Sequence, residues 1–214
     1  MTPPGLPSPR TVAFLAAFVS FATVGCPTDE DLSFCEHILT VAEDPADHDA
    51  LAALLGEVRQ EIYPDLLDLH IDLGPAAIDG AFFQANLDLT TADWEPRERH
   101  YQIQYTDWLF DDPPSHAACG AVLVHEHKHV EDYAGMDAAE LAEFTIAYLA
   151  GGEEVHAYER ETDLRVLEVG CGEALIELRE WAYDHLDQAD YQRYLEQYYT
   201  PDEIREWMEE HPTD

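Results

Sequence analysis

Apolar residues recur at two different spacings along this chain, and the change of spacing separates a helical part from a strand-forming part. Between residues 48 and 62, leucine, valine and isoleucine recur every three or four positions, which indicates a helix with one buried face. Between residues 66 and 106 they alternate with polar residues, most clearly at Tyr101, Ile103 and Tyr105, which indicates strands. Helical spacing then returns and continues to the C-terminus. The pattern predicts an α+β protein with N-terminal helices, a small antiparallel sheet, a central helix and a mostly helical C-terminal half.

Prolines, glycines and capping residues give the expected bounds of these elements. We expect helices at residues 31–42, 48–62, 114–133, 137–150, 153–169, 173–186, 187–199 and 201–210, and strands at 68–73, 80–88 and 98–106. Acidic residues and prolines at 111–114 begin the central helix, and Gly135 ends it. We expect the strand at residues 99–106, just before that helix, to lie at an edge of the sheet and to accept an extended peptide as an added strand.

The first 25 residues are expected to be a signal peptide and not part of the fold. An apolar run at residues 11–25 ends at Thr23-Val24-Gly25-Cys26, and the chain then becomes polar. Small residues before a cysteine resemble a prokaryotic lipobox, which implies that Cys26 carries lipid. We therefore expect a lipoprotein signal peptide at 1–25, a tether and first helix at 26–46, and one domain at 47–214. The expected location is the extracytoplasmic side of a prokaryotic cell envelope; ordinary secretion and an uncleaved anchor remain alternatives.

The charge of the chain is strongly unbalanced. It has 46 acidic and 10 basic residues, for a formal net charge of −36. Such a surface repels nucleic acid and anionic lipid, so nucleic acid is excluded as an expected partner. A solvated acidic coat suited to high salt is the simplest interpretation.

Cysteine usage is consistent with export. If Cys26 is lipidated, Cys35, Cys119 and Cys171 remain, and an oxidising compartment favours one disulfide among them. We prefer Cys119 with Cys171, because both lie in apolar helical segments. Three buried, reduced thiols are the alternative.

The motif that points to chemistry lies in the central helix. It reads His125-Glu126-His127-Lys128-His129, which contains the zinc-helix pattern His-Glu-x-x-His. Positions i and i+4 share one helix face, so His125 and His129 can direct two imidazoles at one zinc ion per chain. Glu126 lies beside them and can act as general base. His127 lies on another face, and we expect it to be a surface or supporting residue.

A third zinc ligand is expected downstream, in the segment GGEEVHAYERETD at residues 151–163. Here the sequence, over residues 99–163, resembles the gluzincins, zinc peptidases whose third ligand is a glutamate on a following helix. Several gluzincin groups, including CAAX-type membrane proteases and phage-repressor-cleaving peptidases, carry it in a Glu-x-x-Ala element. Glu154-Val155-His156-Ala157 matches that element, so the resemblance implies Glu154 as third ligand. Glu153, Glu159 and His156 remain alternatives.

The resemblance implies a zincin-like domain and a function. An exported zinc peptidase would hydrolyse a peptide or protein substrate with zinc-activated water, and Glu126 would take the proton. Tyr158, His156 and Tyr148 are candidates for stabilising the oxyanion or for supporting a ligand. In the membrane proteases an aspartate that steadies a histidine ligand stands at the position of Tyr158. The alternative function is a catalytically inactive zinc-binding or structural envelope lipoprotein on the same scaffold.

Overall fold

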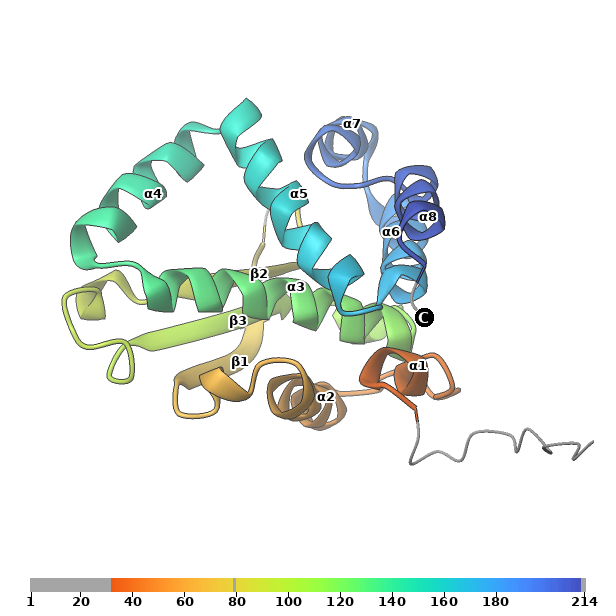
Figure 1. Cartoon of the computed structure of the whole chain (residues 1–214), viewed down its shortest axis with the longest axis horizontal. Helices are drawn as coiled ribbons and strands as arrows, with labels where there is room; N and C mark the ends of the chain where they lie inside the picture. The colour runs from red at the N-terminus through yellow and green to blue at the C-terminus, as the bar shows by residue number, and fades with distance from the viewer. Residues whose placement is uncertain (1–31, 79, 213–214) are drawn as a thin grey trace, which may run out of the picture.

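The computed structural model describes residues 32–78 and 80–212, and Figure 1 shows their arrangement. The predicted signal peptide and Cys26 lie outside the described residues. The helices are α1 (Phe34–Ile38), α2 (His48–Glu61), α3 (His116–Gly135), α4 (Ala138–Ala150), α5 (Glu153–Glu168), α6 (Gly172–His185), α7 (Gln188–Gln197) and α8 (Pro201–Glu210). The strands are β1 (His70–Ala76), β2 (Phe83–Leu87) and β3 (His100–Thr106). The expected α+β class and the helical C-terminal half are confirmed.

The sheet differs from the expected one in two respects. Its three strands lie in the order β1-β3-β2, and β3 pairs with β1 in parallel and with β2 in antiparallel fashion. The sheet is therefore mixed and not antiparallel. The segment at 99–106 was expected at an edge, but β3 is the central strand, since its backbone pairs with β1 on one side and with β2 on the other. Its alternating Tyr101, Ile103 and Tyr105 are buried on one face of the sheet. The expectation that this strand accepts a peptide is thus wrong, and β1 and β2 are the edge strands.

The long helix α3 is the centre of the molecule. Figure 1 shows it crossing beside the sheet, and it contacts β2, β3, α1, α2, α5 and α6. Ser115 caps its first turn, because its hydroxyl accepts a hydrogen bond from the amide of Ala118 at 3.0 Å. Most of its length is buried, including Ala121, Leu123 and Val124, each with 0% exposure. The residues of the His-Glu-x-x-His motif are therefore held by a helix packed on several faces.

Two joints set the direction of the helices that follow. Gly151 and Gly152 both have positive φ, of 69° and 97°, and they turn the chain from α4 into α5. Gly170, with φ of 89°, turns it from α5 toward α6. Without these glycines the three helices could not reverse so sharply, because side chains disfavour that backbone region.

A disulfide fastens the first helix to the second joint. It connects Cys35 of α1 to Cys171 at the start of α6, and Cys119 is free and buried. The preference for Cys119 with Cys171 is therefore wrong. Cys119 lies instead in the apolar interior of α3, with 1% exposure.

None of the helices in residues 32–78 and 80–212 is long and apolar enough to cross a bilayer. Membrane attachment through Cys26 remains a prediction.

Candidate metal centre

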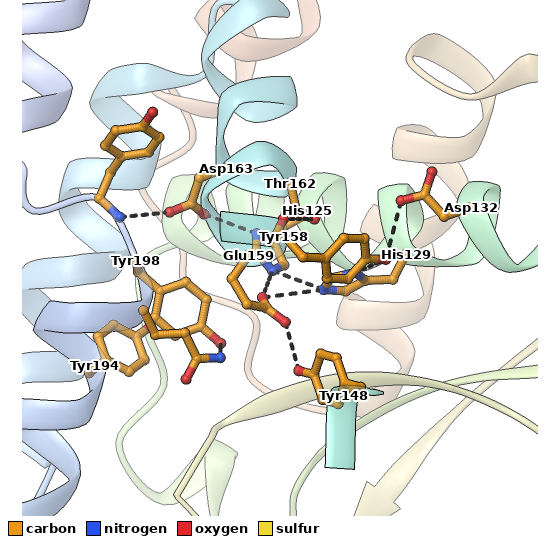
Figure 2. Close-up of polar contacts among 12 residues, drawn as sticks. His125, His129, Asp132, Tyr148, Tyr158, Glu159, Thr162, Asp163, Tyr194 and Tyr198 are labelled. Carbon is orange, nitrogen blue, oxygen red and sulfur yellow. Dashed lines mark hydrogen bonds and ion pairs between the residues drawn. The ribbon is translucent and has the colours of Figure 1, made fainter. Parts of the chain in front are cut away.

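The two histidines of the motif converge, as the helical spacing predicts. His125 and His129 are 4% and 5% exposed, and their Nε2 atoms lie 3.1 Å apart. Both rings emerge from the same side of α3 toward α5 (Figure 2). The predicted pairing of the imidazoles is therefore confirmed.

The third member of the group is Glu159 of α5. Its Oε2 lies 3.1 Å from Nε2 of His125 and 3.5 Å from Nε2 of His129. Together these side chains form a buried group that can hold a metal ion. Glu154, the ligand expected from the resemblance, is exposed and lies outside this group. Glu153, which is also exposed, and His156, which is half-buried, lie outside it as well. The third position falls to Glu159, one of the alternatives considered from the sequence.

The geometry of α5 explains why Glu159 replaces Glu154. The helix buries a stripe at Val155, Glu159, Thr162, Asp163 and Val166, which follows helical spacing. Glu154 lies about 100° around the helix from Val155, and about 140° from Glu159. Glu154, in the first turn of α5, is therefore exposed to solvent, whereas Glu159, in the second turn, directs its carboxylate at α3.

The remaining ring nitrogen of each histidine has its own partner. Nδ1 of His125 lies 2.9 Å from Oδ1 of Asp163, and Nδ1 of His129 lies 2.9 Å from the hydroxyl of Tyr158. The Tyr158 hydroxyl in turn donates to Asp132 at 3.2 Å. Hydrogen bonds at Nδ1 fix the ring orientation and leave Nε2 as the atom that faces the group, an arrangement common around metal-bound histidines. Tyr158 thus orients the ring of His129, which places it for one of the two roles expected for it.

Asp163 is itself held by a buried arginine. Both of its oxygens accept from Nη2 of Arg179, at 2.5 and 2.7 Å, and Arg179 is 2% exposed. Burial raises the pKa of Asp163, but Arg179 and His125 outweigh this effect and hold it below its usual range. Arg179 also donates to the Tyr194 hydroxyl at 2.9 Å, which connects the site to α7.

The carboxylates around the group stabilise positive charge at its centre. Burial lowers the pKa of His125, but its hydrogen bonds to Asp163 and Glu159 outweigh burial and raise the pKa to about 10. The surroundings therefore favour a cation at this point, and a metal ion can supply that charge.

Tyr148 contacts the carboxylate of Glu159 on the side away from the two imidazoles. Its hydroxyl donates to Oε1 of Glu159 at 2.6 Å, so Oε2 alone faces the imidazoles. Figure 2 shows Tyr148 approaching from α4, opposite the helix that carries Glu159. Tyr148 therefore orients Glu159, while His156 is half-buried and contributes only to the wall of the adjacent cleft.

Glu126 lies beside the group with one oxygen unpaired. It is 4% exposed, and among the described residues its Oε2 has no hydrogen-bond partner. Burial raises its pKa, while His129 and His125 lower it, and the net shift is upward. A buried carboxylate with a raised pKa and a free oxygen is suited to accept a proton from a nearby water molecule.

His127 differs from the expected surface residue. Its side chain is fully buried on the other side of α3, where Nδ1 donates to the carbonyl of Leu123 at 2.6 Å and the ring stacks on Tyr63. Burial lowers its pKa to about 4, so the ring is neutral. As expected, it is not part of the metal-binding group.

The spacing of the three facing atoms fits a small tetrahedral cation. Ligand atoms about 2.05 Å from zinc, at tetrahedral angles, lie about 3.3 Å from one another. The observed separations are 3.1, 3.1 and 3.5 Å. Two imidazole nitrogens and one carboxylate oxygen are also a donor set that zinc accepts. The residues present therefore fit the predicted ion.

A cleft of about 560 Å³ opens onto this group. One wall is β2, including Ala85 and Leu87, and the other is α4 with the start of α5. His125, Glu126, His129 and Glu159 line its floor. The group is buried but reachable from solvent by a molecule that enters between β2 and α4.

Sequence reasoning missed Asp163 and Arg179. The signal for Asp163 and Glu159 was present, since both share a helix face with Val155 and Val166, and a carboxylate on a buried face requires a partner. Arg179 gave no such signal before α6 was placed beside α5, because arginines are usually exposed.

Comparison with known proteins identifies no relative of this chain. No protein-family model, no curated protein and no solved structure matches the chain. The functional inference therefore depends on the site itself.

Proposed function

We propose that this protein is an exported, zinc-dependent peptidase. One observation carries the proposal: Nε2 of His125, Nε2 of His129 and Oε2 of Glu159 converge within 3.5 Å, while both Nδ1 atoms are held by outer partners. Three protein ligands leave a fourth zinc position open, which is the arrangement of catalytic sites. The presence of Glu126 beside them favours catalysis over a purely structural role.

The reaction follows from the placement of these groups. His125, His129 and Glu159 would hold a zinc ion, and the ion would supply Lewis acidity toward a water molecule and a carbonyl group. Glu126 takes a proton from the attacking water at its unpaired Oε2 and then delivers it to the leaving amine. Asp163 and Tyr158 keep the imidazoles in place, and Tyr148 keeps Glu159 in place.

The edge of β2 provides a means of holding an extended substrate. The backbone amide of Asp88 donates to the His100 carbonyl at 2.9 Å, and the backbone amide of Thr106 donates to the Phe82 carbonyl at 3.0 Å. The even-numbered residues around β2 therefore pair with β3. The odd-numbered residues then direct their backbone groups away from β3, along the cleft, where the Ala85 amide faces the Glu126 carboxylate. No other strand of the described residues pairs with that edge. A peptide can add there as a strand, with its carbonyl over the metal-binding group.

Tyr198 is the best placed donor for the developing oxyanion. The hydroxyls expected for this role are engaged, Tyr148 with Glu159 and Tyr158 with Asp132. Tyr198 lines the cleft, its ring lies 5.8 Å from that of His125, and its hydroxyl oxygen accepts from Gln197 at 3.1 Å. Its proton can then be given to substrate.

The decisive test of catalysis is Glu126→Gln. The variant should retain one zinc per chain by metal analysis and lose hydrolysis of an unfolded protein substrate by at least a hundredfold, because the amide cannot take a proton. Equal activity in variant and wild type would reject the peptidase proposal. Stoichiometric zinc with no hydrolysis in the wild type would favour the inactive zinc-binding or structural lipoprotein instead.

The ligand assignment has a matched control on the same helix. Glu159→Gln should lower zinc affinity by at least tenfold, whereas Glu154→Gln, one and a half turns away on the exposed face, should leave it unchanged. Competition with a chromophoric chelator measures both. A loss confined to Glu154→Gln would restore the ligand that the resemblance implied.

A further inference from the structure

The wall of the cleft formed by α4 has an unusual composition for this chain. Residues 144–152 (FTIAYLAGG) carry no charge in a protein with 26% charged residues. Leu141, Phe144 and Leu149 of this helix line the cleft, and Leu149 is 81% exposed. A leucine exposed at a rim that continues into a buried apolar wall is a typical feature of a binding surface.

The opposite wall supplies a second apolar rim. Leu87 and Leu89, at the end of β2 and just beyond it, line the same cleft, and Leu89 is 59% exposed. Between the two rims lie the outward backbone groups of β2 and the group formed by His125, His129 and Glu159. The cleft therefore presents polar backbone partners along its length and apolar side chains on both sides.

We infer that this cleft selects extended polypeptide segments that carry bulky apolar side chains next to the bond held over the metal-binding group. The inference rests on the proposed peptidase function and names its substrate class. Apolar side chains of the peptide would be covered by Leu149 and Leu89, while its backbone pairs with β2. The net charge of −36 disfavours acidic segments in addition.

Ile146 provides a matched control on the same helix. It is 70% exposed, like Leu149, but it does not line the cleft. Replacement of either residue by aspartate adds the same charge to the same helix at a solvent-exposed position. Only Leu149→Asp places that charge beside a bound peptide.

The test measures peptide binding without turnover. Zinc-loaded Glu126→Gln protein is titrated with fluorescent decapeptides that carry leucine and phenylalanine at the centre, with serine and glutamine there, or with aspartate there. The apolar peptide should bind at least tenfold more tightly than the others. Leu149→Asp and Leu89→Asp should each weaken it by about tenfold, and Ile146→Asp by less than twofold.

The outcomes separate this inference from the proposed function. Selective binding of the apolar peptide without wild-type hydrolysis would support the inference and reject the peptidase. Hydrolysis by the wild type with equal binding of all three peptides would reject the inference alone. An effect of Ile146→Asp on peptide binding as large as that of Leu149→Asp would also reject the inference. A change of oligomeric state or of vesicle binding in Ile146→Asp would assign the apolar surface to another partner and would reject the inference as well.

Discussion

Replacement of Arg179 by methionine should destabilise the protein severely, although the residue contacts neither metal nor solvent. The variant keeps most of the side-chain volume but removes the cation that faces Asp163, which has 0% exposure. Asp163 would keep His125 and the amide of Tyr199, at 2.9 and 3.1 Å, as partners. A buried carboxylate that loses its cationic partner costs about 3–5 kcal/mol.

The measurement is equilibrium unfolding in guanidinium chloride and thermal unfolding, with a chelator present so that metal binding does not contribute. For a chain of this length the loss corresponds to a fall in Tm of about 6–20 °C. Arg205→Met is the control, since Arg205 is 48% exposed and bridges Glu180 and Asp202 at the surface. It should cost less than about 1 kcal/mol.

A double variant tests the reason for the loss. Arg179→Met with Asp163→Asn removes both charges of this pair and should recover about 1–3 kcal/mol relative to Arg179→Met alone. If Arg179→Met costs no more than Arg205→Met, or if Asp163→Asn gives no recovery, the Arg179–Asp163 pair does not stabilise the fold electrostatically.

Further predictions concern the remaining parts of the structure. Tyr158→Phe should lower zinc affinity about tenfold or more, because His129 loses its Nδ1 partner, and leave the metal-free Tm within a few degrees; chelator competition and calorimetry measure the two. Cys35→Ser should lower the free energy of unfolding by about 2–5 kcal/mol, and a Tm equal to that of the oxidised wild type would contradict this. Because burial raises its pKa, Cys119 should resist alkylation in the folded protein and react only after unfolding, which peptide mapping by mass spectrometry detects. The Tm should rise from low to molar salt, since screening relieves repulsion in a chain of net charge −36, and a flat profile would contradict the halophilic interpretation.

Local features of the fold were predictable, whereas long-range pairings were not. Most helix bounds lie within one or two residues of the prediction, because caps such as Ser115 and Thr200 and joints such as Gly151 and Gly152 act within a few residues. The expected first helix, 31–42, is only Phe34–Ile38 in the structure. Strand order and direction depend on contacts between distant segments, so the central place of β3 could not be read from its alternation.

The same distinction applies to the site and the disulfide. His125 and His129 share one helix, and their spacing alone brings them together. Glu159 belongs to a different helix, and its selection over Glu154 depends on which face of α5 meets α3. Cys35 pairs with Cys171 across 136 residues, a contact for which local sequence carries no signal.

The hydrogen bond from Tyr148 to Glu159 has a thermodynamic consequence. It joins the helix that forms the apolar wall to the carboxylate of the metal-binding group, so a peptide that displaced α4 would change the environment of that carboxylate. Binding free energies are reciprocal: whatever factor a peptide applies to metal affinity, the metal applies to peptide affinity. Peptide titrations with and without zinc, in wild type and Tyr148→Phe, would therefore measure the coupling free energy between peptide binding and zinc binding that the Tyr148 hydroxyl transmits.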